Sequence, residues 1–389
     1  MKIGNSIYLD HQATTPTDNR VSAAMEPFYR EFFGNPHSSE HILGWQSSQA
    51  LEQASAHVAD LLGGTSDEMV FTSGATEANN LAILGSAQAA RSGTRKRIII
   101  SAIEHKCVIA AAMAASDLYG YTVEMAPVDR AGRVDRSWLQ AELDDTVLLV
   151  SIIAVNNEIG TIQNIPEIAE LTHAVGALYH TDGAQAPLAM DLQDISHHAD
   201  MVSLSAHKMY GPKGIGVLYI ERSIQSQIQP IIHGGGQQRN MRSGTVPVPL
   251  VVGMGEAAKI LYEPTAVQER ERMKILRNRL IEGIEKRGIQ ITLNTPINGK
   301  AHPINANIRF VGDNAQDILQ SVQPLLAAST GSACTTGIPE PSHVLRAIGL
   351  SEEEAEGCIR FGLGRFSTED DIDRAVEIIC NTIGKLRTI

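Results

Sequence analysis

The sequence has few cysteines and no long apolar run. Its four cysteines include no CxxC pair, a pattern that fits neither a disulfide framework nor a zinc ribbon and favours a reducing compartment. The longest apolar-rich run, residues 147–155, is far too short to span a membrane. The first ten residues also lack the basic and then apolar stretches of a signal peptide. We therefore expect a cytoplasmic protein without a membrane partner.

Basic residues are also outnumbered by acidic ones. The chain has 32 Lys and Arg against 44 Asp and Glu, a formal net charge of −12. Because phosphate backbones attract positively charged surfaces, direct nucleic-acid binding is not expected. Apolar residues make up 43% of the chain, which is ordinary globular usage. The length of 389 residues indicates two domains.

Short apolar runs alternate with helical patterns through the first two-thirds of the chain. This alternation is typical of βαβ units and predicts a mostly parallel sheet. The predicted strands cover residues 68–72, 97–101, 122–126, 146–153, 178–181, 201–205 and 216–220, and the predicted helices cover 77–90, 106–119, 137–143 and 165–175.

The pattern changes after Gly244. A long charged helix is predicted over residues 251–286, with its charges on a solvated face. A closing helix is predicted to begin at Ser367, with Asp370 three residues later as its capping partner. Further short elements are predicted at 290–293, 305–310, 315–323 and 358–362, which indicates a smaller α+β domain.

Polar residues and glycines gather at the ends of predicted strands, where open α/β sheets bind their ligands. After the strand at 68–72, the chain turns through Ser73 into a helix. Free backbone N–H groups at Gly74, Ala75 and Thr76 would hold a phosphate there. An ordinary capped helix after a tight turn would give the same sequence pattern.

Asp182 and Lys208 also follow predicted strands. A buried carboxylate at Asp182 needs a cation or several donors, which a protonated cofactor ring nitrogen, a helix cap or a salt bridge would supply. Desolvation can lower the pKa of a lysine such as Lys208 and make its amine a nucleophile. The following GPKGIG lacks the ending and spacing of a P-loop, so we do not interpret it as one.

His105 follows the strand at 97–101. It is suited to stack on a flat cofactor or to transfer a proton, although a hydrogen-bonded loop histidine would fit the same position. Cys107 begins an alanine-rich helix and is expected to pack rather than to react. His197, His198 and Asp200 lack a third partner at metal-ligand spacing, so we predict a surface loop and no metal site.

The other cysteines differ in their surroundings. Cys334 lies among small polar residues between Gly331 and Gly337, which predicts an exposed, reactive thiol on a loop. An incidental surface cysteine is the alternative. Cys358 and Cys380 lie within apolar strand and helix patterns, and both are expected in the core.

A phosphate cradle, a buried acid, a strand-end lysine and a histidine together predict pyridoxal phosphate as the cofactor. Transamination does not need a loop thiol, whereas moving a sulfur atom does. A pyridoxal phosphate-dependent aminotransferase or lyase in which Cys334 is incidental is the alternative function.

A series of motifs runs along the chain: YLDHQATTP, GNPHSSEH, FTSGATEANN, EHK, VNNEIG, TDGAQ, SAHKMYGPKGIG, HGGGQQRNMRSGT, GSACTT, EPSHVLRAIGL and IRFGLGRF. In these motifs and their order, the sequence resembles the pyridoxal phosphate-dependent cysteine desulfurases. The resemblance covers nearly the whole chain and implies fold-type I, the aspartate aminotransferase-like α/β fold, with a mostly parallel central sheet and a smaller α+β domain. It implies a large cofactor-binding domain over residues 16–260 and a small domain, built from 1–15 and 261–389, that carries the Cys334 loop.

The resemblance also implies roles for individual residues. Lys208 would attach the cofactor covalently, Asp182 would pair with its pyridine nitrogen, and His105 would stack on its ring. Arg360 with Asn157 would clamp the substrate carboxylate, a task suited to a planar guanidinium. The remaining implied cofactor contacts are Ala75, Thr76, Asn157, Gln185, Ser205, His207 and, from the second subunit of a homodimer, Thr245.

The implied reaction converts L-cysteine to L-alanine. Lys208 would move the Cα proton, His105 would act as acid and base, and the Cys334 thiolate would take the sulfur as a persulfide. A sulfur-acceptor protein would then receive it for iron–sulfur assembly, tRNA thiolation or DNA phosphorothioation.

Overall fold

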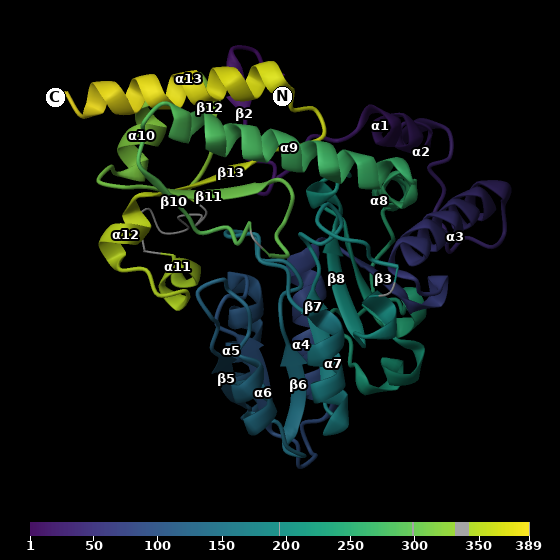
Figure 1. The fold of residues 1–389 in the computed structure, drawn as a ribbon. Coiled ribbons are helices and arrows are strands. Elements are labelled where there is room, and N and C mark those ends of the chain that lie inside the picture. The colour runs from purple at the N-terminus through teal and green to yellow at the C-terminus, as the bar shows by residue number, and fades with distance from the viewer. Residues whose placement is uncertain (194, 298, 331–341, 389) are drawn as a thin grey trace.

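The computed structural model describes residues 1–193, 195–297, 299–330 and 342–388. Its largest sheet has seven strands in the order β3-β9-β8-β7-β6-β4-β5 (Figure 1). Only β9 runs antiparallel to its neighbours within this sheet, so the predicted mostly parallel sheet is confirmed. The strands are β3 (Met69–Thr72), β4 (Arg97–Ser101), β5 (Thr122–Ala126), β6 (Val147–Ser151), β7 (Leu178–Asp182), β8 (Met201–Ser205) and β9 (Gly216–Ile220).

Helices cover both faces of this sheet. Successive side chains of a strand point to opposite faces, and on β4 the side chains of Ile98 and Ile100 belong to one apolar cluster while Ile99 belongs to another. The first cluster packs under α4 (Ala75–Ala89) and α5 (Lys106–Tyr119). The second packs under α3 (Ile42–Leu62), α6 (Arg136–Glu142), α7 (Ile165–Ala174) and α8 (Val248–Tyr262).

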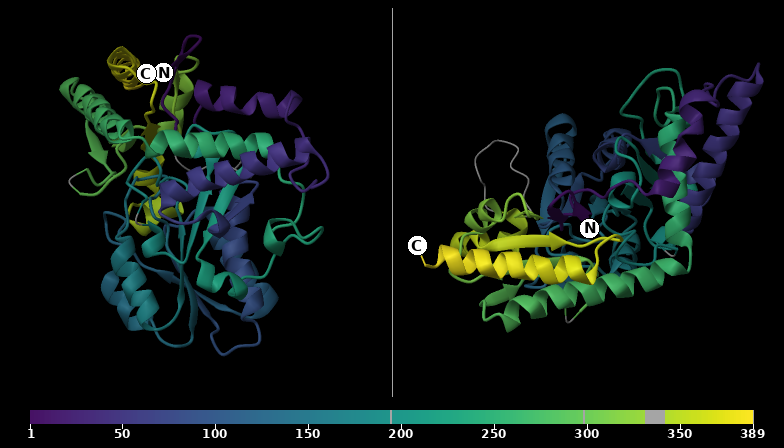
Figure 2. Two further views of the ribbon diagram at one scale, coloured as in Figure 1. Left: turned by 90° about the vertical axis from the view of Figure 1, so that its right-hand side faces the viewer. Right: turned by 90° about the horizontal axis from the view of Figure 1, so that it is seen from above.

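A second, antiparallel sheet contains β10 (Ile291–Leu293), β11 (Asn305–Phe310) and β13 (Cys358–Gly362). The long helices α9 (Thr265–Lys286) and α13 (Glu369–Leu386) lie side by side next to it (Figure 2). Short helices complete this part of the chain: α10 (Ala315–Ser321), α11 (His343–Ala347) and α12 (Glu352–Glu356).

The N-terminal residues pack against the C-terminal part of the chain. Strands β1 (Lys2–Ile3), β2 (Ser6–Tyr8) and β12 (Leu326–Ala327) form a small sheet, and the N-terminal ammonium pairs with Asp371 at 2.7 Å. The chain then runs past β13, where Asp10 bridges to Gly362, before helices α1 (Asn19–Met25) and α2 (Pro27–Arg30).

The structure corrects two predicted helices. The helix expected over residues 251–286 is two helices, because Glu263 is extended and Pro264, which lacks an N–H, separates α8 from α9. The closing helix is capped by Thr368 and Asp371 rather than by Ser367 and Asp370. Within the described ranges, no helix is both long and apolar enough to cross a membrane.

Candidate active site

A cavity of about 820 Å³ opens at the carboxyl ends of the sheet strands, where the motifs predicted a ligand. Cys334 lies outside the described residues. Thr245 is exposed and does not line this cavity. All other predicted site residues line it, namely Ala75, Thr76, His105, Asn157, Asp182, Gln185, Ser205, His207, Lys208 and Arg360.

One end of the cavity is suited to a phosphate. Helix α4 begins at Ala75, and Gly74 before it offers no side-chain cap to the first-turn N–H groups. A Cβ at Gly216 would lie 2.6 Å from the backbone of Gly74, so glycine at the start of β9 is what allows this turn to lie against the strand. Burial lowers the pKa of His207 to about 4, so the ring is neutral. Because the first-turn N–H groups of α4 have no side-chain cap, they can bind an anion here together with side-chain donors.

Asp182 ends β7 and is buried. Its Oδ2 accepts a hydrogen bond from Asn79 Nδ2 at 2.7 Å, and its Oδ1 accepts one from the Ala184 N–H at 2.9 Å. Both donors are neutral, and no ion pair to Asp182 is found among the described residues. A protonated ring nitrogen would supply the missing positive charge.

Lys208 lies on a short 3₁₀ turn, Ala206–Lys208, directly after β8. Its Nζ donates to the carbonyl oxygens of Gln12 at 2.5 Å and Ala13 at 2.8 Å. Burial, together with the positive charge of Arg360, lowers the pKa of Lys208 to about 8. The neutral fraction of the amine near neutral pH is therefore much larger than that of an exposed lysine, as a nucleophilic amine requires.

His105 makes a close contact with Cys107. Its Nδ1 lies 2.9 Å from Cys107 Sγ and accepts the Cys107 N–H at 3.2 Å. Burial lowers the pKa of His105 and raises that of Cys107 to about 11, so the thiol stays protonated. Asn79 Nδ2 also donates to Cys107 Sγ at 3.2 Å. Cys107 thus packs as predicted, but it also lines the cavity, which the sequence interpretation missed.

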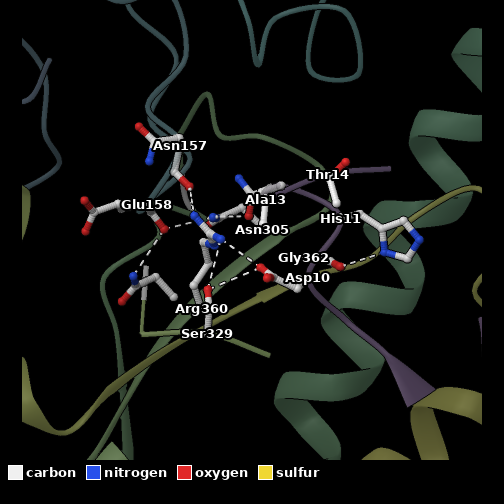
Figure 3. A network of polar contacts seen from close by, with 12 residues as sticks. Asp10, His11, Ala13, Thr14, Asn157, Glu158, Asn305, Ser329, Arg360 and Gly362 are labelled. Carbon is white, nitrogen blue, oxygen red and sulfur yellow. Dashed lines mark hydrogen bonds and ion pairs between the residues drawn. The ribbon is translucent and has the colours of Figure 1, made fainter. Parts of the chain in front are cut away.

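Arg360 lies on β13 with its side chain 5% exposed. Its Nη1 donates to the Asn157 carbonyl oxygen at 2.9 Å, and its Nη2 donates to Asp10 Oδ1 at 2.8 Å and to Ser329 Oγ at 3.0 Å (Figure 3). Asn157 therefore contacts Arg360 through its backbone. The predicted pair lies together on the cavity wall.

The sequence matches the class-V aminotransferase family over residues 7–375. This chain belongs to that family. Cysteine desulfurase IscS of Rickettsia rickettsii (strain Iowa) is 43% identical over 98% of this chain and 92% of its own length. A solved NifS-like protein superposes with a TM-score of 0.90 at 33% identity, covering 97% of this chain and 99% of that one. The structure titled SspA in complex with cysteine has a TM-score of 0.81 at 34% identity, covering 93% and 100%.

The comparisons confirm the predicted fold-type I architecture and the pyridoxal phosphate cofactor for this member of the family. The residues present fit that cofactor. Asp182 is a buried acid without a cationic partner among the described residues, Lys208 is a buried amine of lowered pKa, and the uncapped start of α4 faces the same cavity.

Several cavity residues carry no role from the sequence interpretation. Glu104 is fully buried, accepts from Ser101 Oγ at 2.5 Å and from the Ile153 N–H at 2.7 Å, and burial raises its pKa to about 8. Its position directly before His105 was the only available signal. Other such residues are Asp10, Thr14, Glu158, Ser329 and His343, which reach the cavity from segments far apart in the sequence.

Proposed function

We propose that this chain is a pyridoxal phosphate-dependent cysteine desulfurase, which converts L-cysteine to L-alanine and transfers the sulfur to Cys334 as a persulfide. One observation carries the proposal: a single cavity unites a buried amine, a buried unneutralised acid and a guanidinium. The likeness to cysteine desulfurase IscS over nearly the whole chain supports it.

Different cavity residues bind different parts of the cofactor and the substrate. The first turn of α4, with Ser205 and His207, binds the cofactor phosphate, and Asp182 pairs with the ring nitrogen. Arg360 binds the substrate carboxylate, because its planar guanidinium matches a carboxylate in shape and charge.

The bound cofactor supplies an electron sink that acidifies the Cα–H bond of the substrate. Lys208 accepts and returns the proton through Nζ, and His105 exchanges protons with the substrate thiol and amine. The Cys334 thiolate attacks the substrate sulfur. An S–S bond forms, the substrate Cβ–S bond breaks with its electron pair moving to carbon, and protonation of that carbon completes alanine.

The proposal also covers the oligomeric state of the enzyme, its location and its sulfur acceptor. We infer a homodimer in which Thr245 reaches the phosphate site of the second subunit, a location in the cytoplasm, and a protein that accepts sulfur from Cys334. The acceptor serves iron–sulfur assembly, tRNA thiolation or DNA phosphorothioation.

The test is to incubate the cofactor-loaded protein with L-cysteine and a reductant. We expect sulfide and alanine in equal amounts, and loss of both when Cys334→Ser is used. Cys380→Ser, which changes a buried thiol of α13, is the matched control and should keep the activity. Amino transfer to a keto acid without sulfide release would instead support the aminotransferase alternative.

A further inference from the structure

Arg360 already has a carboxylate partner within the protein. Asp10 Oδ1 lies 2.8 Å from Arg360 Nη2, and Ser329 Oγ contacts both side chains, at 3.0 Å from Nη2 and 3.2 Å from Asp10 Oδ1. Both Asp10 and Arg360 line the cavity. The resident carboxylate therefore shares a guanidinium with the substrate carboxylate that Arg360 is proposed to bind.

The backbone fixes this arrangement. The Arg360 N–H donates to the Ser329 carbonyl oxygen at 2.7 Å, and the His11 N–H donates to the Gly362 carbonyl oxygen at 3.0 Å. These bridges hold the segments on either side of β13 in place, so Asp10 and Ser329 are set beside the guanidinium (Figure 3). The contact does not depend on a flexible surface side chain.

The guanidinium has donors left for a second carboxylate. Arginine has five N–H donors, and the hydrogen bonds to Asn157, Asp10 and Ser329 use three of them. The Nε atom is buried without a hydrogen-bond partner. A second N–H remains on Nη1. A bound carboxylate would therefore share the guanidinium with Asp10.

A second carboxylate at this group is subject to repulsion from Asp10. The side chains of Arg360 and Asp10 are only 5% and 19% exposed, so salt and water screen their charges weakly. Like charges placed together at a binding site oppose binding. Without Asp10, a lone buried guanidinium would hold any small carboxylate more firmly.

We propose that Asp10 sets the strength of carboxylate binding: by sharing the Arg360 guanidinium it keeps the affinity of the site for the substrate and product carboxylates low. This inference rests on the proposed function, because it assumes that Arg360 binds those carboxylates. Its consequence is easy release of alanine, which carries the same carboxylate as cysteine.

The test compares propionate with propionamide, which has nearly the same shape but no charge. Dissociation constants of the cofactor-loaded wild-type protein and Asp10→Asn are measured by ligand-observed NMR titration. Asp10→Asn should tighten propionate binding by roughly tenfold or more, because like-charge repulsion is removed. Propionamide binding should stay within about twofold, since a neutral ligand is not repelled.

Two further variants keep the test decisive. Asp10→Ser is a second neutral replacement and should also tighten propionate binding, whereas Asp10→Glu keeps the charge and should leave it near the wild-type value. If the role of Asp10 were purely structural, every variant would bind both propionate and propionamide more weakly. Unchanged or weaker propionate binding in the neutral variants overturns the proposal.

Failure of this inference is distinguishable from failure of the proposed function. If wild-type protein releases sulfide and alanine from cysteine but the neutral Asp10 variants do not bind propionate more tightly, only the role of Asp10 is wrong. If the wild type releases no sulfide, the proposed function is wrong.

Discussion

At the residue scale, the chemistry depends on the protonation of Lys208. An exposed lysine has a pKa near 10.5, whereas burial and Arg360 lower that of Lys208 to about 8. The amine is then mostly protonated below pH 8 and mostly neutral above it. Only the neutral amine attacks a carbonyl.

The rate of cofactor uptake by cofactor-free protein should therefore rise with pH and level off with a midpoint near 8. Stopped-flow absorbance after mixing with pyridoxal phosphate measures this rate. A midpoint close to the ordinary lysine value of 10.5 would show that the amine is not desolvated as described.

Lys208→Ala should remove covalent cofactor attachment, because neither of the other described cavity lysines, Lys106 and Lys213, follows β8 directly. The absorbance of the cofactor-loaded protein and its retention on desalting measure attachment. Lys259→Ala, at an exposed position of α8, is the control and should behave as wild type. An unaltered chromophore in Lys208→Ala contradicts the assignment.

Local sequence patterns singled out site residues at the ends of predicted strands, whereas the family resemblance supplied others, such as Arg360 within β13. Asp182, Lys208 and His105 follow predicted strands, and the structure brings them to one cavity. Asp10 and Arg360 are 350 residues apart in the sequence. Their contact depends on the bridges along β13, which no local pattern encodes.

At the element scale, the phosphate end of the cavity depends on close packing of β9 against the turn before α4. Gly216→Ala would place a Cβ 2.6 Å from the Gly74 backbone and from the Leu204 carbonyl oxygen. We expect a loss of about 1 to 3 kcal/mol in the free energy of unfolding, as for other overpacked sites, and weaker cofactor binding.

Gly384→Ala is the matched control for this prediction, because a Cβ there meets nothing within 4 Å in helix α13. It should stabilise the protein by about 0.5 to 1 kcal/mol, since alanine suits a helix interior better than glycine. Denaturant unfolding and cofactor titration compare the two variants. Equal cofactor affinity in both would contradict the proposed role of the turn.

Elements with a strong local pattern were predicted closely. The strands at 97–101, 201–205 and 216–220 have the predicted bounds, because continuous apolar runs between turn residues mark strands buried on both faces. The edge strand at 122–126 also has the predicted bounds, although most of its residues are not buried. Strands β1 and β12 have two residues each and exist through pairing with distant segments, so no periodicity could reveal them. The break at Pro264 had a local signal, which the charged pattern around it obscured.

At the scale of the whole molecule, the proposed role of Thr245 would link the cofactor site to the proposed dimer. Because Thr245 is exposed and absent from the cavity of its own chain, any effect it has on the cofactor must come from a second copy. The division into a large domain of residues 16–260 and a small domain of residues 1–15 and 261–389 stays a prediction.

Thr245→Ala should therefore weaken cofactor binding several-fold while the protein remains a dimer. Light scattering should give twice the chain mass of 41.9 kDa, and cofactor titration should give the affinity. A monomeric wild type, or a Thr245→Ala variant with unchanged cofactor affinity, would refute this arrangement.

The central claim is that sulfur leaves cysteine and is bound by one thiol of this chain. The most direct measurement is mass spectrometry with peptide mapping after brief treatment of the cofactor-loaded protein with L-cysteine. We predict one added sulfur atom on the peptide that contains Cys334, and none on the peptides that contain Cys107, Cys358 or Cys380. Added sulfur on one of those cysteines, or no added sulfur while alanine accumulates, would contradict the account.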